Sequence, residues 1–143
     1  MEIVVAKSGG FCRGVKKAVD TALSVEPKNT YIFGEIIHNP EVVKEITDRG
    51  IKTVESLDEV PSGATLIIRS HGVGKEIYEL CEKRNIHIED CTCEFVHRTQ
   101  KIISEQYGLG KAIVIVGEKT HPEVVGLNGW CENSAYIFSS EEE

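Results

Sequence analysis

The chain lacks long hydrophobic runs, and no apolar stretch approaches the roughly 20 residues that a membrane-spanning helix needs. It also lacks a basic and apolar leader, so we expect a cytoplasmic protein rather than a secreted or membrane-inserted one. Positive charge is scarce as well, because 16 basic residues face 23 acidic ones and the net charge is -7. This balance argues against nucleic acid as the main partner, although local amides, histidines and lysines can still bind a small anion.

The length and hydrophobic content of the chain suffice for a folded core. With 143 residues and 41% hydrophobic content, one or two small domains are expected. The five cysteines are Cys12, Cys81, Cys91, Cys93 and Cys131. An odd count without a secretory leader argues against a disulfide framework and favours thiols used for metal binding or catalysis. We expect Cys81 to lie in the core and leave Cys131 undecided.

Short hydrophobic segments alternate with amphipathic ones along the chain. We predict strands over residues 2–6, 31–34, 51–54, 65–69, 87–89, 111–116 and 136–138 and helices over 15–25, 75–84 and 95–107. A further helix runs from the N-cap Asn39 to a C-cap at Gly50, a capping box opens a single turn at 56–59, and Ser139-Ser140 indicates one more N-cap. The helix over 95–107 should bury Val96, Ile102 and Ile103. This alternation predicts an α/β fold with small, mostly parallel sheets.

Cys12 lies in a glycine-rich stretch between the first predicted strand and the first predicted helix. Glycines allow a sharp turn and a close approach of the backbone to a ligand, and a helix N-terminus attracts negative charge. With Arg13, Lys16 and Lys17 nearby, the Cys12 thiol should ionise more easily than a free cysteine, which suits metal binding or redox chemistry. A buried structural cysteine explains the pattern equally well.

Four further candidates lie where a predicted strand ends and a helix begins: His38, His71, Cys93 and His121. Because ligands of parallel sheets bind outside the carboxyl ends of the strands, we expect all four to meet Cys12 in one cleft. Two thiolates can hold part of an iron–sulfur cluster or a zinc site, and three histidines beside helix N-termini can bind phosphate or diphosphate.

Three other residues complete the list of candidates. Glu123 lies two residues beyond His121 and could donate a proton to a leaving group. Cys91 and His97 have weaker claims, because a neighbouring thiol and a histidine on a helix face are more often structural. The sequence Pro-Glu-Val-Val follows both His38-Asn39 and His121, which indicates either a weak internal repeat or two independent helix starts.

Five motifs together carry a family resemblance. They are GFCRGV (10–15), IHN (37–39), RSHGV (69–73), DCTC (90–93) and GEKTHPEV (117–124). In this order they resemble the 4-hydroxy-3-methylbut-2-enyl diphosphate reductase family, whose members catalyse the terminal step of the non-mevalonate isoprenoid pathway. The resemblance implies a trefoil of three αβ units around an iron–sulfur cluster, with one cysteine contributed by each unit. It also implies reductive removal of the substrate's allylic hydroxyl, giving isopentenyl and dimethylallyl diphosphates.

The resemblance also implies roles for individual residues. Cys12 and Cys93 would bind a 4Fe–4S cluster, His38, His71 and His121 would bind the substrate diphosphate, and Glu123 would relay protons. Reduced ferredoxin or flavodoxin would supply electrons. The third cysteine and further diphosphate ligands fall beyond position 143 in the family, and Cys131 does not match the third-ligand motif. We therefore expect a complete first unit over 1–93, a partial second unit over 94–143 and an incomplete cluster site.

One position departs from the family pattern, because Glu94 stands where the family usually has proline after the second cluster cysteine. Two other classes of protein remain as alternatives. One is a structural zinc protein that uses Cys12, Cys91, Cys93 and a histidine. The other is a non-catalytic module that binds diphosphate.

Overall fold

A four-stranded parallel sheet organises the first part of the computed structural model, which describes residues 3–4, 6 and 9–139. Its strands are β1 (Thr30–Phe33), β2 (Lys52–Val54), β3 (Thr65–Ile68) and β4 (His87–Asp90), in the order β2-β1-β3-β4. Every neighbouring pair is parallel, which confirms the predicted α/β class with parallel pairing.

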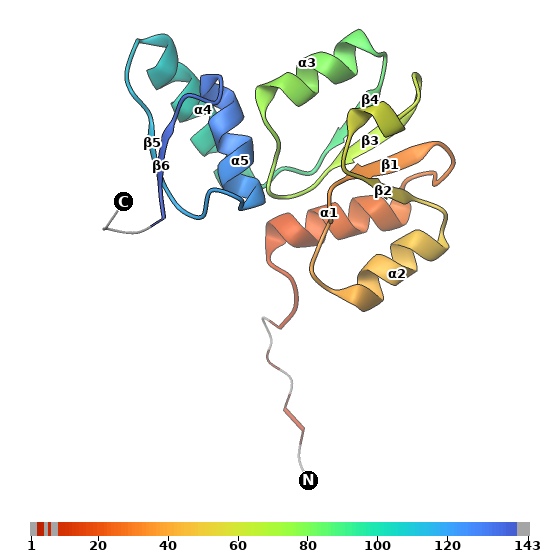
Figure 1. The fold of residues 1–143 in the computed structure, drawn as a ribbon. Helices are drawn as coiled ribbons and strands as arrows, with labels where there is room; N and C mark the ends of the chain where they lie inside the picture. The colour runs from red at the N-terminus through yellow and green to blue at the C-terminus, as the bar shows by residue number, and fades with distance from the viewer. Residues whose placement is uncertain (1–2, 5, 7–8, 140–143) are drawn as a thin grey trace.

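Helices cover both faces of this sheet (Figure 1). Helices α1 (Arg13–Ser24) and α2 (Pro40–Asp48) lie on one face, and α3 (Lys75–Lys83) lies on the other. Ile32 and Ile67 pack toward α1 and α2, whereas Leu66 packs toward α3 in a cluster with Cys81. Burial on both sides is the usual state of a parallel sheet, and it confirms that Cys81 is a core residue. We call this sheet with α1, α2 and α3 the first unit.

The second unit is smaller. It contains α4 (Glu94–Gly108), β5 (Val114–Val116), α5 (Pro122–Asn128), the short 3₁₀ helix η2 (Gly129–Cys131) and β6 (Tyr136–Phe138). Strands β5 and β6 pair in parallel, and Ile115 and Ile137 of the middle register pack toward α4 and α5. Cys131 is fully buried in the same cluster, and its thiol donates to the backbone oxygen of Asn128. This position identifies Cys131 as a core residue of the second unit.

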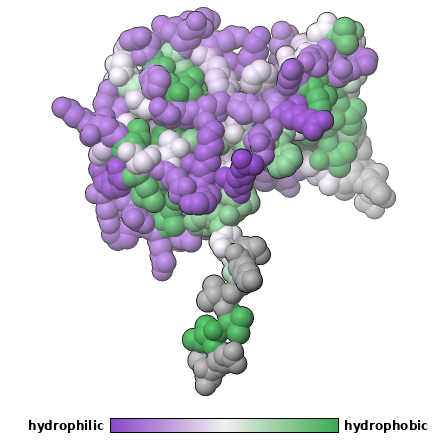
Figure 2. Space-filling view, turned by 180° about the vertical axis from the view of Figure 1, so that it is seen from behind, coloured by the Kyte–Doolittle hydropathy of each residue, from purple (hydrophilic) through white to green (hydrophobic). Residues whose placement is uncertain are grey.

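The other face of the β5–β6 sheet is uncovered in the described chain. Val114, Val116 and Tyr136 are 61%, 81% and 62% exposed. Figure 2 shows, from behind, a green hydrophobic area at the end of the molecule that carries the C-terminus. Among the described residues no helix is long and apolar enough to span a bilayer.

The predicted helix starts are confirmed in detail. The Asn39 side chain accepts hydrogen bonds from the backbone N–H groups of Glu41 and Val42, and Pro40 is the first residue of α2. The capping box at Ser56 and Glu59 forms and opens the short 3₁₀ helix η1 (Leu57–Glu59). Local chemistry at helix ends was therefore sufficient to place these elements.

Several predictions were wrong. The described residues of the predicted strand over 2–6, namely Ile3, Val4 and Ala6, form no strand, and Ile3 and Val4 are exposed; Glu2 and Val5 lie outside the described residues. A hydrophobic strand sequence needs a partner strand, and these residues have none in the described structure. The strand expected over 111–116 is shortened to Val114–Val116, because its partner β6 has only three residues. The helix start expected at Ser139-Ser140 extends into residues outside the described range.

The buried stripe of α4 was also predicted incorrectly. Val96 and Ile103 are buried, but Ile102 is 49% exposed. Gln100, which is 1% exposed, occupies the stripe instead, since residues 96, 100 and 103 share one helical face. A prediction based on hydrophobicity alone misses this buried face, because one of its residues is polar.

Candidate functional site

The two candidate thiols lie at the N-termini of two different helices. Cys12 is the N-cap of α1 and Cys93 is the N-cap of α4, and neither side chain makes a capping hydrogen bond. Both thiols line one cavity of about 460 Å³. Its wall consists of Cys12, Arg13, Gly14, Lys17, Thr92, Cys93, Glu94, Phe95 and His97.

Gly14 explains how the two helix ends come so close. A Cβ atom on Gly14 would lie 3.1 Å from the Cβ and 3.2 Å from the Sγ of Cys93, so the first turn of α1 packs directly against that thiol. Lys17, one turn along α1, donates to the backbone oxygen of Asp90 at the end of β4. The structure therefore brings together two thiols that are 81 positions apart in the sequence, as the motifs predicted.

The element that positions Cys12 in this cavity differs from the one expected. Cys93 follows β4 directly, as predicted, but no described strand precedes Cys12. Its position depends on α1, which packs on the first sheet through Ala18 and Ala22. Among the described residues, the packing of α1 is therefore what brings Cys12 to the site.

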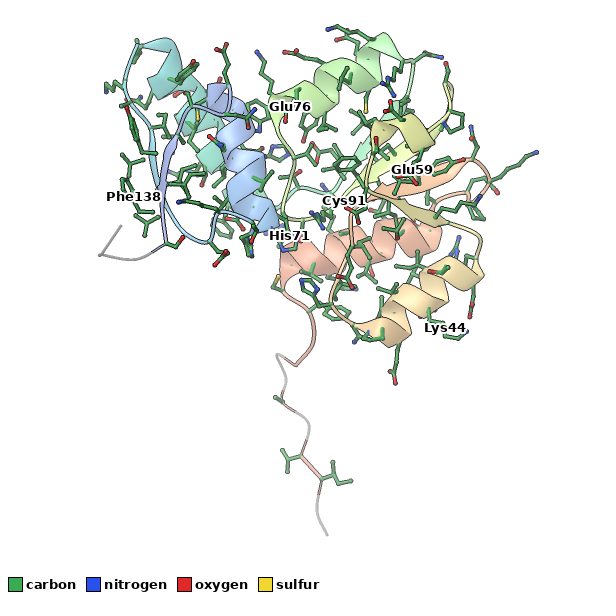
Figure 3. The ribbon with its side chains drawn as sticks, in the orientation of Figure 1. Lys44, Glu59, His71, Glu76, Cys91 and Phe138 are labelled. Atoms are coloured by element: carbon green, nitrogen blue, oxygen red, sulfur yellow. The ribbon has the colours of Figure 1, made fainter. Side chains whose placement is uncertain are left out.

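The three candidate histidines each follow a strand, as predicted, but none of them lines the thiol cavity, so the expectation that all five candidates share one cleft was wrong. His38 follows β1, His71 follows β3 and His121 follows β5. The rings of His71 and His121 meet edge to face, with centroids 5.8 Å apart and an interplanar angle of 79°. Figure 3 shows His71 between the two units, near the N-terminal ends of α1 and α5.

Hydrogen bonds define which ring nitrogen of two histidines is free. His121 is the N-cap of α5, and its Nδ1 accepts from the backbone N–H of Glu123 at 3.2 Å. In the neutral ring the proton is therefore on Nε2, which is left free to donate to an anion. In His38 the Nδ1 lies 3.0 Å from a carboxylate oxygen of Glu35, so Nδ1 carries a proton there. The Nε2 of the neutral His38 ring is then an acceptor, and it becomes a donor only when the ring is doubly protonated.

The surroundings of His71 disfavour the protonated form of its ring. Burial lowers its pKa, and the positive charges of Arg69, His121 and His38 lower it further. Its Nδ1 is buried and has no hydrogen-bond partner among the described residues. Because an anion favours the protonated ring, phosphate or diphosphate bound here would offset the effects of burial and of the neighbouring positive charges on His71.

Glu123 is in the first turn of α5, where a carboxylate is favoured by the helix dipole. Its backbone N–H holds the ring of His121, so the two residues are linked at the start of one helix. The side chain is half-buried. The residue predicted to deliver protons therefore lies next to an imidazole of the cluster.

The sequence reasoning undervalued His97 and Thr92, both of which line the thiol cavity. His97 Nε2 lies 3.2 Å from Asp90 Oδ2, and this carboxylate also accepts hydrogen bonds from Tyr78 and from the backbone of Thr92. Burial would raise the pKa of Asp90, but these hydrogen bonds together hold it below its ordinary value. The spacing of four residues between Cys93 and His97 was the available signal, since it puts both on one helix face.

Cys91 does not share this site. It is 2% exposed and packs in the core beneath α1, and burial raises the pKa of its thiol. In the part of the chain that the structure describes, no three His, Cys, Asp or Glu side chains are close enough to hold a metal ion. The zinc hypothesis, which required Cys12, Cys91, Cys93 and a histidine together, therefore gains no support.

The thiol cavity nevertheless suits part of an iron–sulfur site. Thiolates are the usual ligands of such clusters, and helix N-termini stabilise the negative charge of thiolates. Cys12 is exposed and Cys93 is partly exposed, so both sulfurs are accessible to an incoming group. Two ligands fit, and the described chain supplies no third thiol to the cavity wall.

The fold and site thus define an α/β protein with a paired-thiol cavity and an imidazole cluster at the junction of two parallel sheets. A family model described as LytB protein matches residues 3–143. The chain belongs to the LytB family.

Curated relatives and solved structures agree with this assignment. The chain is 49% identical to the 4-hydroxy-3-methylbut-2-enyl diphosphate reductase of Caldanaerobacter subterraneus subsp. tengcongensis, across 100% of this chain and 52% of the relative. It is 42% identical to the reductase of the same name from Clostridioides difficile (strain 630), with the same coverage.

Two solved structures share the fold. The E-1-hydroxy-2-methyl-but-2-enyl-4-diphosphate reductase of Plasmodium falciparum superposes with a TM-score of 0.85 at 27% identity, covering 95% of this chain and 44% of that one. A second structure, of an (E)-4-hydroxy-3-methyl-but-2-enyl diphosphate reductase described as the terminal enzyme of the non-mevalonate pathway, gives 0.80 at 36% identity, covering 96% and 50%. The chain therefore spans about half the length of the relatives it matches.

Proposed function

We propose that this chain supplies the N-terminal part of a reductase that removes the allylic hydroxyl of 4-hydroxy-3-methylbut-2-enyl diphosphate. The products would be isopentenyl and dimethylallyl diphosphates. One observation carries the proposal. Residues from the two units form both a cavity lined by Cys12 and Cys93 and a ring contact between His71 and His121. The relatives that bear this enzyme name match the whole chain.

The net reaction breaks one allylic C–O bond and adds two electrons and two protons, releasing the oxygen as water. Cys12 and Cys93 would hold an iron–sulfur cluster, taken to be 4Fe–4S. When bound, this cluster would supply electrons and a Lewis-acidic iron. Reduced ferredoxin or flavodoxin would be the electron donor, and the reaction would take place in the cytoplasm.

The imidazoles would bind the diphosphate. The Nε2 of His121 can donate to a phosphate oxygen, because its Nδ1 accepts from the backbone of Glu123. His38 directs Nδ1–H at Glu35, so its Nε2 donates to a phosphate oxygen when the ring is doubly protonated, a form that the neighbouring carboxylate and the phosphate both favour. His71 would become protonated on binding, since a nearby anion favours the charged ring.

Glu123 would hold the proton that the leaving hydroxyl needs. Its place beside His121 would bring the carboxyl close to a substrate whose diphosphate is bound by the imidazoles. Glu94, on the wall of the thiol cavity and 3.6 Å from Arg13, adds a carboxylate where family members usually have proline. We expect this negative charge to make reduction of a bound cluster less favourable.

We also propose a division into two units, with residues 1–93 forming one αβ unit and residues 94–143 forming part of another. The proposal is supported by the separate cores of the two sheets and by the uncovered apolar face of β5 and β6. If each unit of the trefoil contributes one cysteine to the cluster, this division predicts that the isolated chain cannot hold a complete cluster.

A chimera tests the proposed function. This chain would replace the matched half of the Caldanaerobacter reductase, and the product would be reconstituted anaerobically with iron and sulfide. We expect brown absorbance and dehydroxylation in the chimera. Cys12→Ser and Cys93→Ser should each lose the absorbance, whereas Glu123→Gln should keep it and lose about 100-fold or more in kcat.

The controls separate the alternatives. Lys52→Gln, on the distant strand β2, should change neither absorbance nor turnover. Stoichiometric zinc in place of iron, or pyrophosphate binding without turnover in a fully loaded chimera, would contradict the reductase assignment. Turnover by the isolated chain at the rate of the chimera would contradict its incompleteness.

A further inference from the structure

We propose that Arg69 is a positioning residue for His38. Its guanidinium holds the loop between β1 and α2 through Glu35, and Glu35 in turn orients the imidazole toward the diphosphate. This inference rests on the proposed diphosphate site. It gives a role to an arginine that binds no ligand directly in the proposed mechanism.

The connection is a continuous chain of contacts. Arg69 directly follows β3 and lies two positions before His71. Its Nη1 donates to the backbone oxygen of Glu35 at 3.1 Å. The Glu35 carboxylate lies 3.0 Å from Nδ1 of His38. A side chain from the end of one strand therefore determines where the loop after the neighbouring strand presents its imidazole.

Gly34 provides the space for this arrangement. Its φ is +69°, a conformation that L side chains rarely adopt. A Cβ atom at position 34 would lie 2.7 Å from both Cζ and Nη1 of Arg69, so the guanidinium rests against the bare backbone of Gly34. The backbone N–H of Gly34 donates to Val54, which anchors the start of the loop to β2.

The hydrogen bonding of Arg69 is incomplete. Its Nε is buried and has no partner among the described residues, and buried donors of this kind are rare in native structures. Burial also lowers the pKa of Arg69, against the opposing effect of Glu55 and Glu35. The hydrogen bond from Nη1 to the Glu35 carbonyl is therefore the contact that fixes the guanidinium in its partly buried position.

The geometry requires arginine and not merely a positive charge. The flat guanidinium fits against Gly34 while one of its ends reaches the Glu35 carbonyl. Lysine would keep the charge near His71 but would lack the planar group and its fixed donors. A role as a simple charge therefore predicts a mild effect of Arg69→Lys, whereas positioning predicts a large one.

The test uses the chain itself, with pyrophosphate binding measured by calorimetry and the ring nitrogens of His38 observed by ¹⁵N NMR. Arg69→Lys should weaken pyrophosphate binding about 10- to 100-fold and shift the His38 nitrogen signals. Glu35→Gln, at an exposed position, should do the same. The double variant should bind no more weakly than the weaker single variant, because both changes break one connection.

Arg49→Lys is the matched control. Arg49 also donates to a backbone oxygen, that of Val25, but lies away from the imidazoles, so its replacement should leave both readouts unchanged. Unchanged His38 signals in Arg69→Lys, or losses of affinity that add in the double variant, would overturn the proposal. If Arg69→Lys unfolds, Glu35→Gln decides between the same outcomes.

Different results would overturn the positioning role of Arg69 and the proposed diphosphate site. If the parent chain does not bind pyrophosphate, the proposed diphosphate site fails. The His38 nitrogen signals would still respond to Arg69→Lys if the positioning is correct.

Discussion

Both faces of the parallel sheet are covered in the first unit, whereas in the second unit only one face is covered. In the first unit, α1 and α2 bury Ile32 and Ile67 while α3 buries Leu66. In the second, α4 and α5 bury Ile115 and Ile137 but leave Val114, Val116 and Tyr136 exposed. A parallel sheet is normally buried on both sides, so the first unit has the usual burial, whereas the second leaves one apolar face exposed among the described residues.

The two units also use the same helix-start sequence differently. In α2, Asn39 caps the helix and His38 lies one position earlier. In α5, His121 is itself the cap. The shared Pro-Glu-Val-Val segment thus begins a helix in both units, but the histidine is offset by one position. The Nδ1 of His121 accepts a hydrogen bond and the Nδ1 of His38 donates one, so the two neutral rings carry their proton on different nitrogens.

The largest expected effect comes from truncating one aliphatic residue to alanine in each of the two sheets. Ile67→Ala, in the core of the first unit, should lower the free energy of unfolding by about 2–5 kcal/mol because it leaves a cavity. Val116→Ala, on the uncovered face of β5, should change it by less than about 0.5 kcal/mol. Urea unfolding followed by circular dichroism measures both. Similar losses in the two variants would show that the face of β5 is covered in solution.

A second prediction concerns pH and the imidazoles at the boundary between the units. The pKa of His71 is lowered in the folded chain, so above about pH 6.5 the ring is neutral in both states and contributes no penalty. As pH falls below that value the unfolded chain binds the proton first, and the free energy of unfolding should decrease. Replacing His71 with Asn should flatten this decrease, whereas His87→Asn, at the start of β4, should not.

Pyrophosphate should reverse the effect, because it favours protonated His71. We expect binding about tenfold tighter at pH 6 than at pH 8, with uptake of a proton that calorimetry in two buffers can detect. Affinity that is independent of pH would indicate that His71 does not contact the anion.

The contact between the two units should respond to a smaller change. Trp130 Nε1 donates to the backbone oxygen of Val73 at 3.0 Å, and its ring lies against Tyr78 of α3. Trp130→Phe should cost about 0.5–1.5 kcal/mol and speed hydrogen exchange in the loop after β3. Tyr107→Phe, which breaks an exposed hydrogen bond within the second unit, should leave exchange in that loop unchanged.

The smallest effect is expected at the two helix caps. Asn39→Ala should cost about 0.5–1 kcal/mol, since two backbone N–H groups lose their acceptor. His121→Asn should preserve stability, because Asn is a good cap, yet weaken pyrophosphate binding by removing the imidazole. Loss of stability in His121→Asn would show that the ring matters for packing beyond its capping bond.

Much of the fold followed from local chemistry that a sequence contains. Helix caps at Asn39 and Ser56 need only neighbouring backbone groups, so their predictions were accurate. The strand-to-helix junctions at His38, His71, Cys93 and His121 followed from the alternation of elements in the same way. The described residues of the strand expected over 2–6, namely 3, 4 and 6, form no strand, because strand formation depends on a partner, which no local pattern supplies.

The amino-acid sequence by itself determined the parallel α/β class, the helix starts and the candidate thiols and imidazoles, because these depend on side-chain type and short spacings. Only the tertiary structure decided that Gly14 lies against Cys93, that Cys91 turns into the core and that His97 joins the cavity wall. It also decided that Arg69 reaches the Glu35 loop. Each of these contacts joins residues or surfaces whose proximity depends on how helices pack on the sheets, and packing is a property of the whole chain.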